Sequence, residues 1–85
     1  MIKILHDGVL YEYPEVRVHI TDNIYFENGG FFPNTKAVAR IFTSSGIPAA
    51  VGDTLLYENS QFVIAGIRDR RRHTTVPHWK ITARG

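Results

Sequence analysis

The sequence predicts an all-β domain, a small antiparallel β-barrel or sandwich of about six to seven short strands. Apolar and polar residues alternate with a period of two in residues 16–20 and 79–83, which is typical of strands with one buried face. Glycine, proline and asparagine recur along the chain at roughly the spacing of short strands and turns. No stretch of about ten residues free of these breakers has helical periodicity.

The first half of the chain contains several candidate strands. Residues 2–5 and 9–13 are separated by an Asp7-Gly8 pair, which favours a tight hairpin turn. Residues 16–20 alternate Val, Val and Ile with polar residues. Residues 35–42 are the best helical candidate, but the β-branched and aromatic residues at their end favour a strand.

The second half predicts a hairpin followed by a final strand. Residues 54–67 contain two β-leaning runs joined by Glu58-Asn59-Ser60, which has the composition of a turn. The run QFVIAGIR, residues 61–68, is apolar on both faces, which suits a central strand covered on two sides. In residues 79–84 the alternation places Trp79 on the same, inward face as the apolar residues that follow it.

Length and composition restrict the class of protein. The 85 residues are enough for one domain, residues 1–85, with a core of modest size. The absence of cysteine excludes a disulfide framework and a zinc–thiolate site. No run of about 18 apolar residues predicts a membrane span, and MIKILHDG lacks the pattern of a signal peptide. We therefore expect no membrane partner and a protein that is made in a cytoplasm.

The net charge of +2 hides a strong asymmetry along the chain. Residues 1–60 carry four basic and seven acidic residues, a net charge of −3, whereas residues 61–85 carry six basic residues and one acidic residue, a net charge of +5. A chain polarised in this way can attract unlike surfaces with its two parts.

Four arginines, Arg68, Arg70, Arg71 and Arg72, lie within five positions and are the main candidate binding residues. One interpretation is a solvated loop that keeps a small β protein soluble. The other is an electrostatic contact, because the arginine fork pairs with phosphates and carboxylates. Nucleic-acid backbone and the acidic surface of another subunit both fit. Trp79 is predicted to point into the core, which argues against stacking on a base. Contact with phosphate groups alone still fits.

The segment NIYFENGGFFP, residues 23–33, places four aromatic residues around an Asn-Gly-Gly turn. One interpretation is a hairpin whose aromatic side chains complete the core. The other is an exposed tip that presents Phe31 and Phe32 to a partner, since exposed aromatic residues are enriched at binding interfaces.

The sequence contains little that indicates catalysis, and we expect no enzyme activity, cofactor or metal site. His73 and His78 have a weak metal-ligand spacing without carboxylate or cysteine support. Ser44-Ser45 precedes a glycine in turn-like composition, and Asp53 follows a glycine at the predicted start of a strand. No glycine-rich phosphate loop precedes a helix and a lysine.

Residues 36–84 resemble the C-terminal half of small neck proteins of tailed phages. These are the head-closure, or stopper, and head–tail joining proteins, which are also described as minor capsid or head–tail connector proteins. The resemblance includes Ile47-Pro48, a Gly52-Asp53 pair that opens a hairpin, an Asp-x-Arg-Arg-type loop at residues 69–72, and a final strand that begins His78-Trp79-Lys80. The sequence departs from the pattern at Arg72-His73, where a glycine is expected after the arginines.

The resemblance implies a structural virion protein, assembled in the host cytoplasm, that is a β-barrel monomer in solution and joins a ring on assembly. Its implied partners are further copies of itself and the neighbouring portal, adaptor and tail-end proteins, with a possible contact to DNA backbone. The alternative is a sequence-independent nucleic-acid-binding module of the SH3-like or OB-like type, and a small regulatory phage factor is a third reading.

Overall fold

A computed structural model describes residues 1–27, 30–72 and 74–85, and the side chains of residues 22–34 lie outside the described part. The described residues form one antiparallel sheet of seven strands, which confirms the all-β prediction. The strands are β1 (Ile2–His6), β2 (Val9–Tyr13), β3 (Val16–Glu27), β4 (Gly30–Ile41), β5 (Thr54–Tyr57), β6 (Ser60–Asp69) and β7 (Trp79–Arg84).

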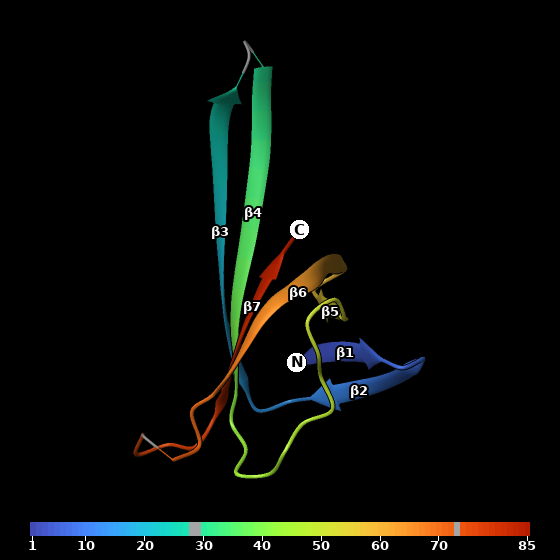
Figure 1. Ribbon diagram of the computed structural model, residues 1–85, viewed down its shortest axis with the longest axis vertical. Coiled ribbons are helices and arrows are strands. Elements are labelled where there is room, and N and C mark those ends of the chain that lie inside the picture. The colour runs from blue at the N-terminus through green and yellow to red at the C-terminus, as the bar shows by residue number, and fades with distance from the viewer. Residues whose placement is uncertain (28–29, 73) are drawn as a thin grey trace.

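The sheet curls into a half-barrel with the strand order β2-β1-β5-β6-β7-β4-β3. Figure 1 shows the β1–β2 hairpin running almost across the direction of the β3–β4 hairpin, so the two ends of the sheet are strongly twisted relative to each other. In the described sheet β2 and β3 are edge strands, each paired on one side only. The sheet therefore keeps two edges that a closed barrel would remove.

Two tight turns connect the short hairpins as the sequence predicted. Asp7 and Gly8 both have positive φ, 49° and 77°, between β1 and β2. Glu58 and Asn59, with φ of 47° and 67°, do the same between β5 and β6. Positive φ at both central residues is the property of a type I′ turn, whose twist matches that of the flanking strands.

The core lies inside the curl of the sheet. Directly paired residues Val18, Ala39, Ile81 and Ile67 form one inward row across β3, β4, β7 and β6. The buried positions of β4 and β7 include three alanines, Ala37, Ala39 and Ala83, which allow neighbouring strands to pack around a narrow interior. The fully buried apolar residues are Ile2, Ile4, Ala37, Ala39, Ile41, Leu55, Phe62, Ile64, Ile81 and Ala83.

The prediction that residues 61–68 are covered on two sides is wrong. β6 is central in the sheet, but Val63 is 56% exposed whereas its neighbour Ile64 is 1% exposed. The described sheet forms a single layer, so the outer face of β6 meets solvent. A register shift between Ile64 and Gly66 marks a β-bulge that returns the second half of the strand to its alternation.

β3 and β4 are longer than the short strands expected, with 12 residues each. Their pairing with β7 ends at Lys36 and Arg84, whereas their pairing with each other continues to Glu27 and Gly30. The outer part of this hairpin therefore projects from the sheet as a two-stranded arm (Figure 1).

Candidate charged interface

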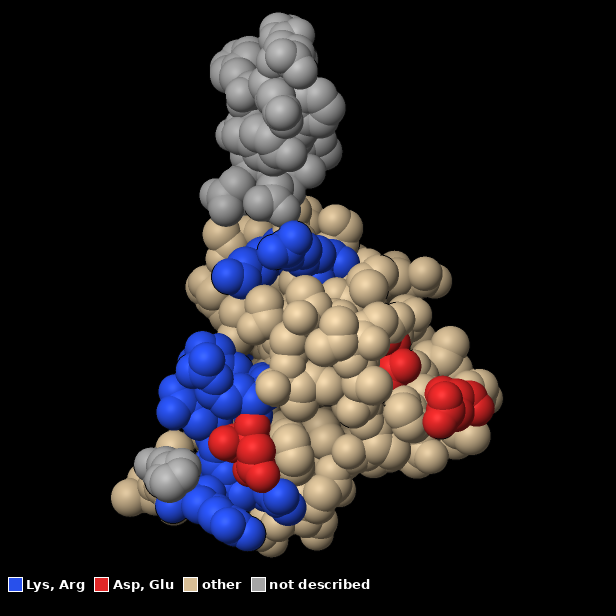
Figure 2. Space-filling model, viewed as in Figure 1, with Lys and Arg blue, Asp and Glu red and all other residues tan. Residues whose placement is uncertain are grey.

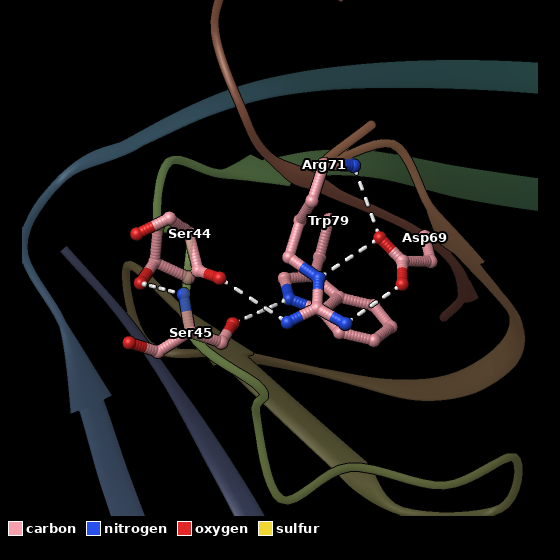
Figure 3. Close-up of polar contacts among 6 residues, drawn as sticks. Ser44, Ser45, Asp69, Arg71 and Trp79 are labelled. Atoms are coloured by element: carbon pink, nitrogen blue, oxygen red, sulfur yellow. Dashed lines mark hydrogen bonds and ion pairs between the residues drawn. The ribbon is translucent and has the colours of Figure 1, made fainter. Parts of the chain in front are cut away.

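Arg71 is held inside the molecule by the residues around it (Figure 3). Its Nε and Nη2 donate hydrogen bonds of 3.0 and 2.9 Å to Oδ1 and Oδ2 of Asp69. Nη1 donates a 3.2 Å bond to the carbonyl of Ser44, and the guanidinium carbon lies 4.6 Å from the ring centroid of Trp79. The planar fork and the cation–π contact together use most of the binding capacity of this side chain.

Trp79 contacts both the core and the guanidinium of Arg71. It is partly buried and packs against the core, which agrees with the inward phase predicted for it. Its indole Nε1 donates a 2.9 Å hydrogen bond to the carbonyl of Ser45. One side of the ring thus belongs to the core while the guanidinium of Arg71 covers another part, and the ring is not free to stack on a base.

The ion pair changes the acidity of Asp69. Hydrogen bonds from the side chain and backbone N–H of Arg71 lower the pKa of Asp69 to about 2, and the charge of Arg72 acts in the same direction. The same side-chain hydrogen bond raises the pKa of Arg71. Hydrogen bonds to the charged form of a carboxyl group favour that form, so Asp69 is an anion at neutral pH.

The rest of the loop after β6 is closed by backbone and threonine hydrogen bonds. The N–H of Arg70 donates to the carbonyl of His78 at 3.0 Å. The hydroxyl of Thr74 lies 3.0 Å from the carbonyl of Arg70 and 2.6 Å from that of Val76. Arg70 is half-buried and Arg72 is exposed, while His73 lies outside the described residues.

The four predicted arginines therefore occupy different positions in the structure. Arg70, Arg71 and Arg72 belong to the loop, with Arg71 engaged by Asp69. Arg68 lies within β6, on its outer face, directly opposite Lys80 of β7. The bulge at residue 65 decides this placement, because uninterrupted alternation from Ile64 would turn Arg68 to the inner face.

Phe31 and Phe32 lie on β4 in the projecting arm. Their backbones pair with those of Phe26 and Tyr25 of β3. Their side chains fall outside the described part of the structure, so their docking role stays a prediction.

A pair that sequence reasoning missed connects the end of β1 to the start of β5. Nδ1 of His6 lies 2.6 Å from Oδ2 of Asp53, and Nε2 lies 3.2 Å from Oδ2 of Asp7. The hydrogen bond to Asp53 raises the pKa of His6, and the same bond lowers the pKa of Asp53. Asp53 also accepts a 2.8 Å hydrogen bond from the N–H of Ala50, which agrees with its predicted role in a turn.

On the face shown in Figure 2, the Lys and Arg side chains lie away from the β1–β2 hairpin, although Lys3 of β1 itself pairs with Glu12. Figure 2 shows them below the projecting arm and around the loop after β6, where one acidic group lies among them, and other acidic side chains lie toward the β1–β2 end.

Among the residues whose side chains the structure describes, 1–21, 35–72 and 74–85, no three His, Asp or Glu side chains come together as a metal site would require. Within the same ranges, no helix has the length and apolarity needed to cross a membrane. Comparison with protein-family models, with curated proteins and with solved structures found no match to this chain.

Proposed function

We propose that this chain is a structural protein of a phage head–tail connector, which closes the head or joins head to tail as one subunit of a ring. The proposal combines the resemblance of residues 36–84 to phage neck proteins with the shape of the molecule. Its partners would be further copies of the chain and the neighbouring portal, adaptor and tail-end proteins.

The observation that carries the proposal is the difference between the two edges of the sheet. At one edge the outer face presents an exposed apolar pair, Leu5 and Leu10, which are directly opposite on β1 and β2 and are 40% and 46% exposed, next to the ion pair of Lys3 and Glu12. At the other edge the β3–β4 arm projects beyond the sheet. Unlike surfaces on opposite sides of one molecule suit head-to-tail contacts, and these close into rings when the rotation allows.

The projecting arm is itself a reason to expect a neighbour. A two-stranded hairpin without a third strand or a covering layer is marginally stable in water. Its open edge, β3, offers backbone groups to which another chain can add. An adjacent subunit would supply the missing contacts.

The alternative, a nucleic-acid-binding module that acts through the arginine loop, has less support from the geometry. Asp69 neutralises Arg71, and the guanidinium of Arg71 covers Trp79. This leaves Arg70 and Arg72 as the loop cations without an ion pair in the described part of the chain.

The test is disruption of the gene in the phage or prophage genome that encodes the chain. We expect the gene to lie between the portal and tail-tube genes, and its loss to give DNA-filled heads that leak DNA or remain separate from tails in electron micrographs. Normal tailed particles without this chain would contradict the proposal.

Two variants test the exposed Leu5–Leu10 pair in the same complementation assay. Leu5→Lys/Leu10→Lys should fail to restore tailed particles. Val51→Lys, at a loop residue that is 66% exposed, should restore them. Restoration by both variants would show that the Leu5–Leu10 pair is not a subunit contact.

A further inference from the structure

The strand register brings together four basic residues that are far apart in the sequence. Arg17 of β3 is directly opposite Arg40 of β4, Arg40 is opposite Lys80 of β7, and Lys80 is opposite Arg68 of β6. Directly opposed residues in a sheet point to the same face. With strands about 4.8 Å apart, the row spans roughly 14 Å across the outer face. We call it the cationic row.

A second pair of cations extends this surface along the strands. Lys36 of β4 is opposite Arg84 of β7, four residues beyond Arg40 and Lys80. Four residues of a strand correspond to about 14 Å. Beside the row lies a shallow hollow of about 210 Å³, lined by Gly66, Ile67, Arg68, Lys80 and Thr82.

No described acidic side chain balances these charges. The outer positions of the four strands whose side chains the structure describes carry no Asp or Glu. Asp69, the nearest carboxylate in the chain to Arg68, is opposite Trp79 on the inner side and pairs with Arg71. Like charges placed directly opposite each other destabilise a sheet. A ligand with closely spaced negative charge would relieve this repulsion.

We infer that the outer face of β3, β4, β7 and β6, with the cationic row at its centre, binds the phosphate backbone of duplex nucleic acid. The row is regular and of one sign, and guanidinium and ammonium groups are the usual partners of phosphate oxygens. The ligand that neutralises such a surface must itself present closely spaced negative charge, as a duplex does.

The same face does not resemble a protein interface or a single-strand site. Protein interfaces have a core rich in aromatic residues and poor in charge, whereas the outer positions described on these strands hold cations, together with His19, Gln61, two valines (Val38 and Val63) and small residues. Single-strand sites add aromatic side chains on which bases stack. The described outer face offers none, so the backbone of a duplex is the occupant that fits.

This inference goes beyond the connector proposal and differs from the binding loop expected from the sequence. It assigns the contact to a sheet surface that includes only Arg68 of the four predicted arginines. Because the test uses the purified chain alone, its failure would leave the connector proposal standing, and the reverse also holds.

The experiment measures binding of a fluorescein-labelled 20-base-pair DNA duplex by fluorescence anisotropy between 50 and 200 mM NaCl. Four to six phosphate contacts predict a slope of log K against log salt of about −4 to −5. Affinity should be the same for duplexes of different sequence. Lack of binding at 50 mM NaCl would overturn the inference.

Two double variants that each remove two charges locate the site. Arg40→Gln/Lys80→Gln should weaken binding at 100 mM NaCl by tenfold or more and make the slope shallower by about 2. Arg70→Gln/Arg72→Gln, in the loop, should change the slope by less than 1. Equal losses in the two variants, or a larger loss in the loop variant, would overturn the inference.

Two further arms complete the test. Arg17→Gln/Arg68→Gln, at the ends of the cationic row, should weaken binding as the central pair does, and both row variants should melt at or above the wild-type temperature. Poly-glutamate serves as an acidic polypeptide. If it binds as tightly as the duplex and shows the same dependence on the row, the surface recognises acidic protein and the inference is wrong.

Discussion

The guanidinium carbon of Arg71 lies 4.6 Å from the ring centroid of Trp79, while its nitrogens pair with both carboxylate oxygens of Asp69. This contact joins the loop after β6 to the first residue of β7. It also distinguishes Arg71, which is held by these contacts, from Arg70 and Arg72, which make no ion pair in the described part of the chain. Arginines that look equivalent in the sequence therefore have different contacts in the structure.

Replacement of Arg71 by lysine should loosen the loop although the charge is kept. Lysine cannot reproduce the planar fork that binds both oxygens of Asp69. We expect Tm to fall by a few degrees and the emission of Trp79, the only tryptophan, to shift to the red. Arg72→Lys is the matched control, because Arg72 is exposed and makes no ion pair in the described structure. Equal effects of the two variants would contradict the role of Arg71.

Acid titration should disrupt the same contact at unusually low pH. The pKa of Asp69 is lowered from 3.8 to about 2, so its contribution to stability is present above pH 4 and is lost as pH falls toward 2. Trp79 emission should therefore change with a midpoint near 2, and Asp69→Asn should abolish this step. A midpoint near 4 would show that the ion pair does not form in solution.

The pair between His6 and Asp53 should stabilise the protein within a limited pH window. The pKa of His6 is raised, so its contribution is present below the usual value of 6.5 and is lost as pH rises through the folded-state pKa. The pKa of Asp53 is lowered, so its contribution is lost as pH falls below 3.8 through its own folded-state pKa. The contribution is largest between these limits.

Melting curves from pH 3 to 9 test this window. His6→Gln should remove the decline of Tm on the alkaline side that wild type shows. His19→Gln is the control, because His19 is exposed on β3 and the described structure gives it no carboxylate partner. If the Tm of His6→Gln still declined at alkaline pH as in wild type, the stabilising role of the His6–Asp53 pair would be refuted.

Neighbouring residues of β6 should differ sharply in their contribution to stability. Ile64 is 1% exposed and Val63 is 56% exposed. Ile64→Ala leaves a cavity and should lower the free energy of unfolding by about 2–5 kcal/mol. Val63→Ala should change it by about 0.5 kcal/mol or less. Urea denaturation measures both, and similar losses would mean that the outer face is covered in solution.

Local sequence predicted the strands and their turns because both depend on near neighbours. The alternation of residues 16–20 and 79–83 identifies a buried face, and Asp7-Gly8 and Glu58-Asn59 have residue types that suit positive φ. In residues 61–68 apolar and polar residues do not alternate. Both faces of the segment are apolar, and this suggested a strand that is covered on two sides. The Ala65-Gly66 pair inside this strand was the available signal of a bulge.

The candidate site could likewise be predicted from the sequence only in part. The position of the arginine cluster in a loop after a strand followed from the local pattern, but the partners of Arg71 did not, since the carbonyl of Ser44 is 27 residues away. His6 and Asp53 are 47 residues apart in the chain and could not be connected by spacing. Register decides which residues become neighbours across strands, and it is a property of the whole sheet.

The sequence by itself determined an all-β chain with defined hairpins, an inward Trp79 and a charge that changes sign along its length. Only the tertiary structure decided that Arg17, Arg40, Lys80 and Arg68 share one row and that Arg71 is held by Asp69. The physical reason is that side-chain alternation is a local property of the backbone. The order and register of strands, in contrast, arise when residues far apart in the chain bury one common core.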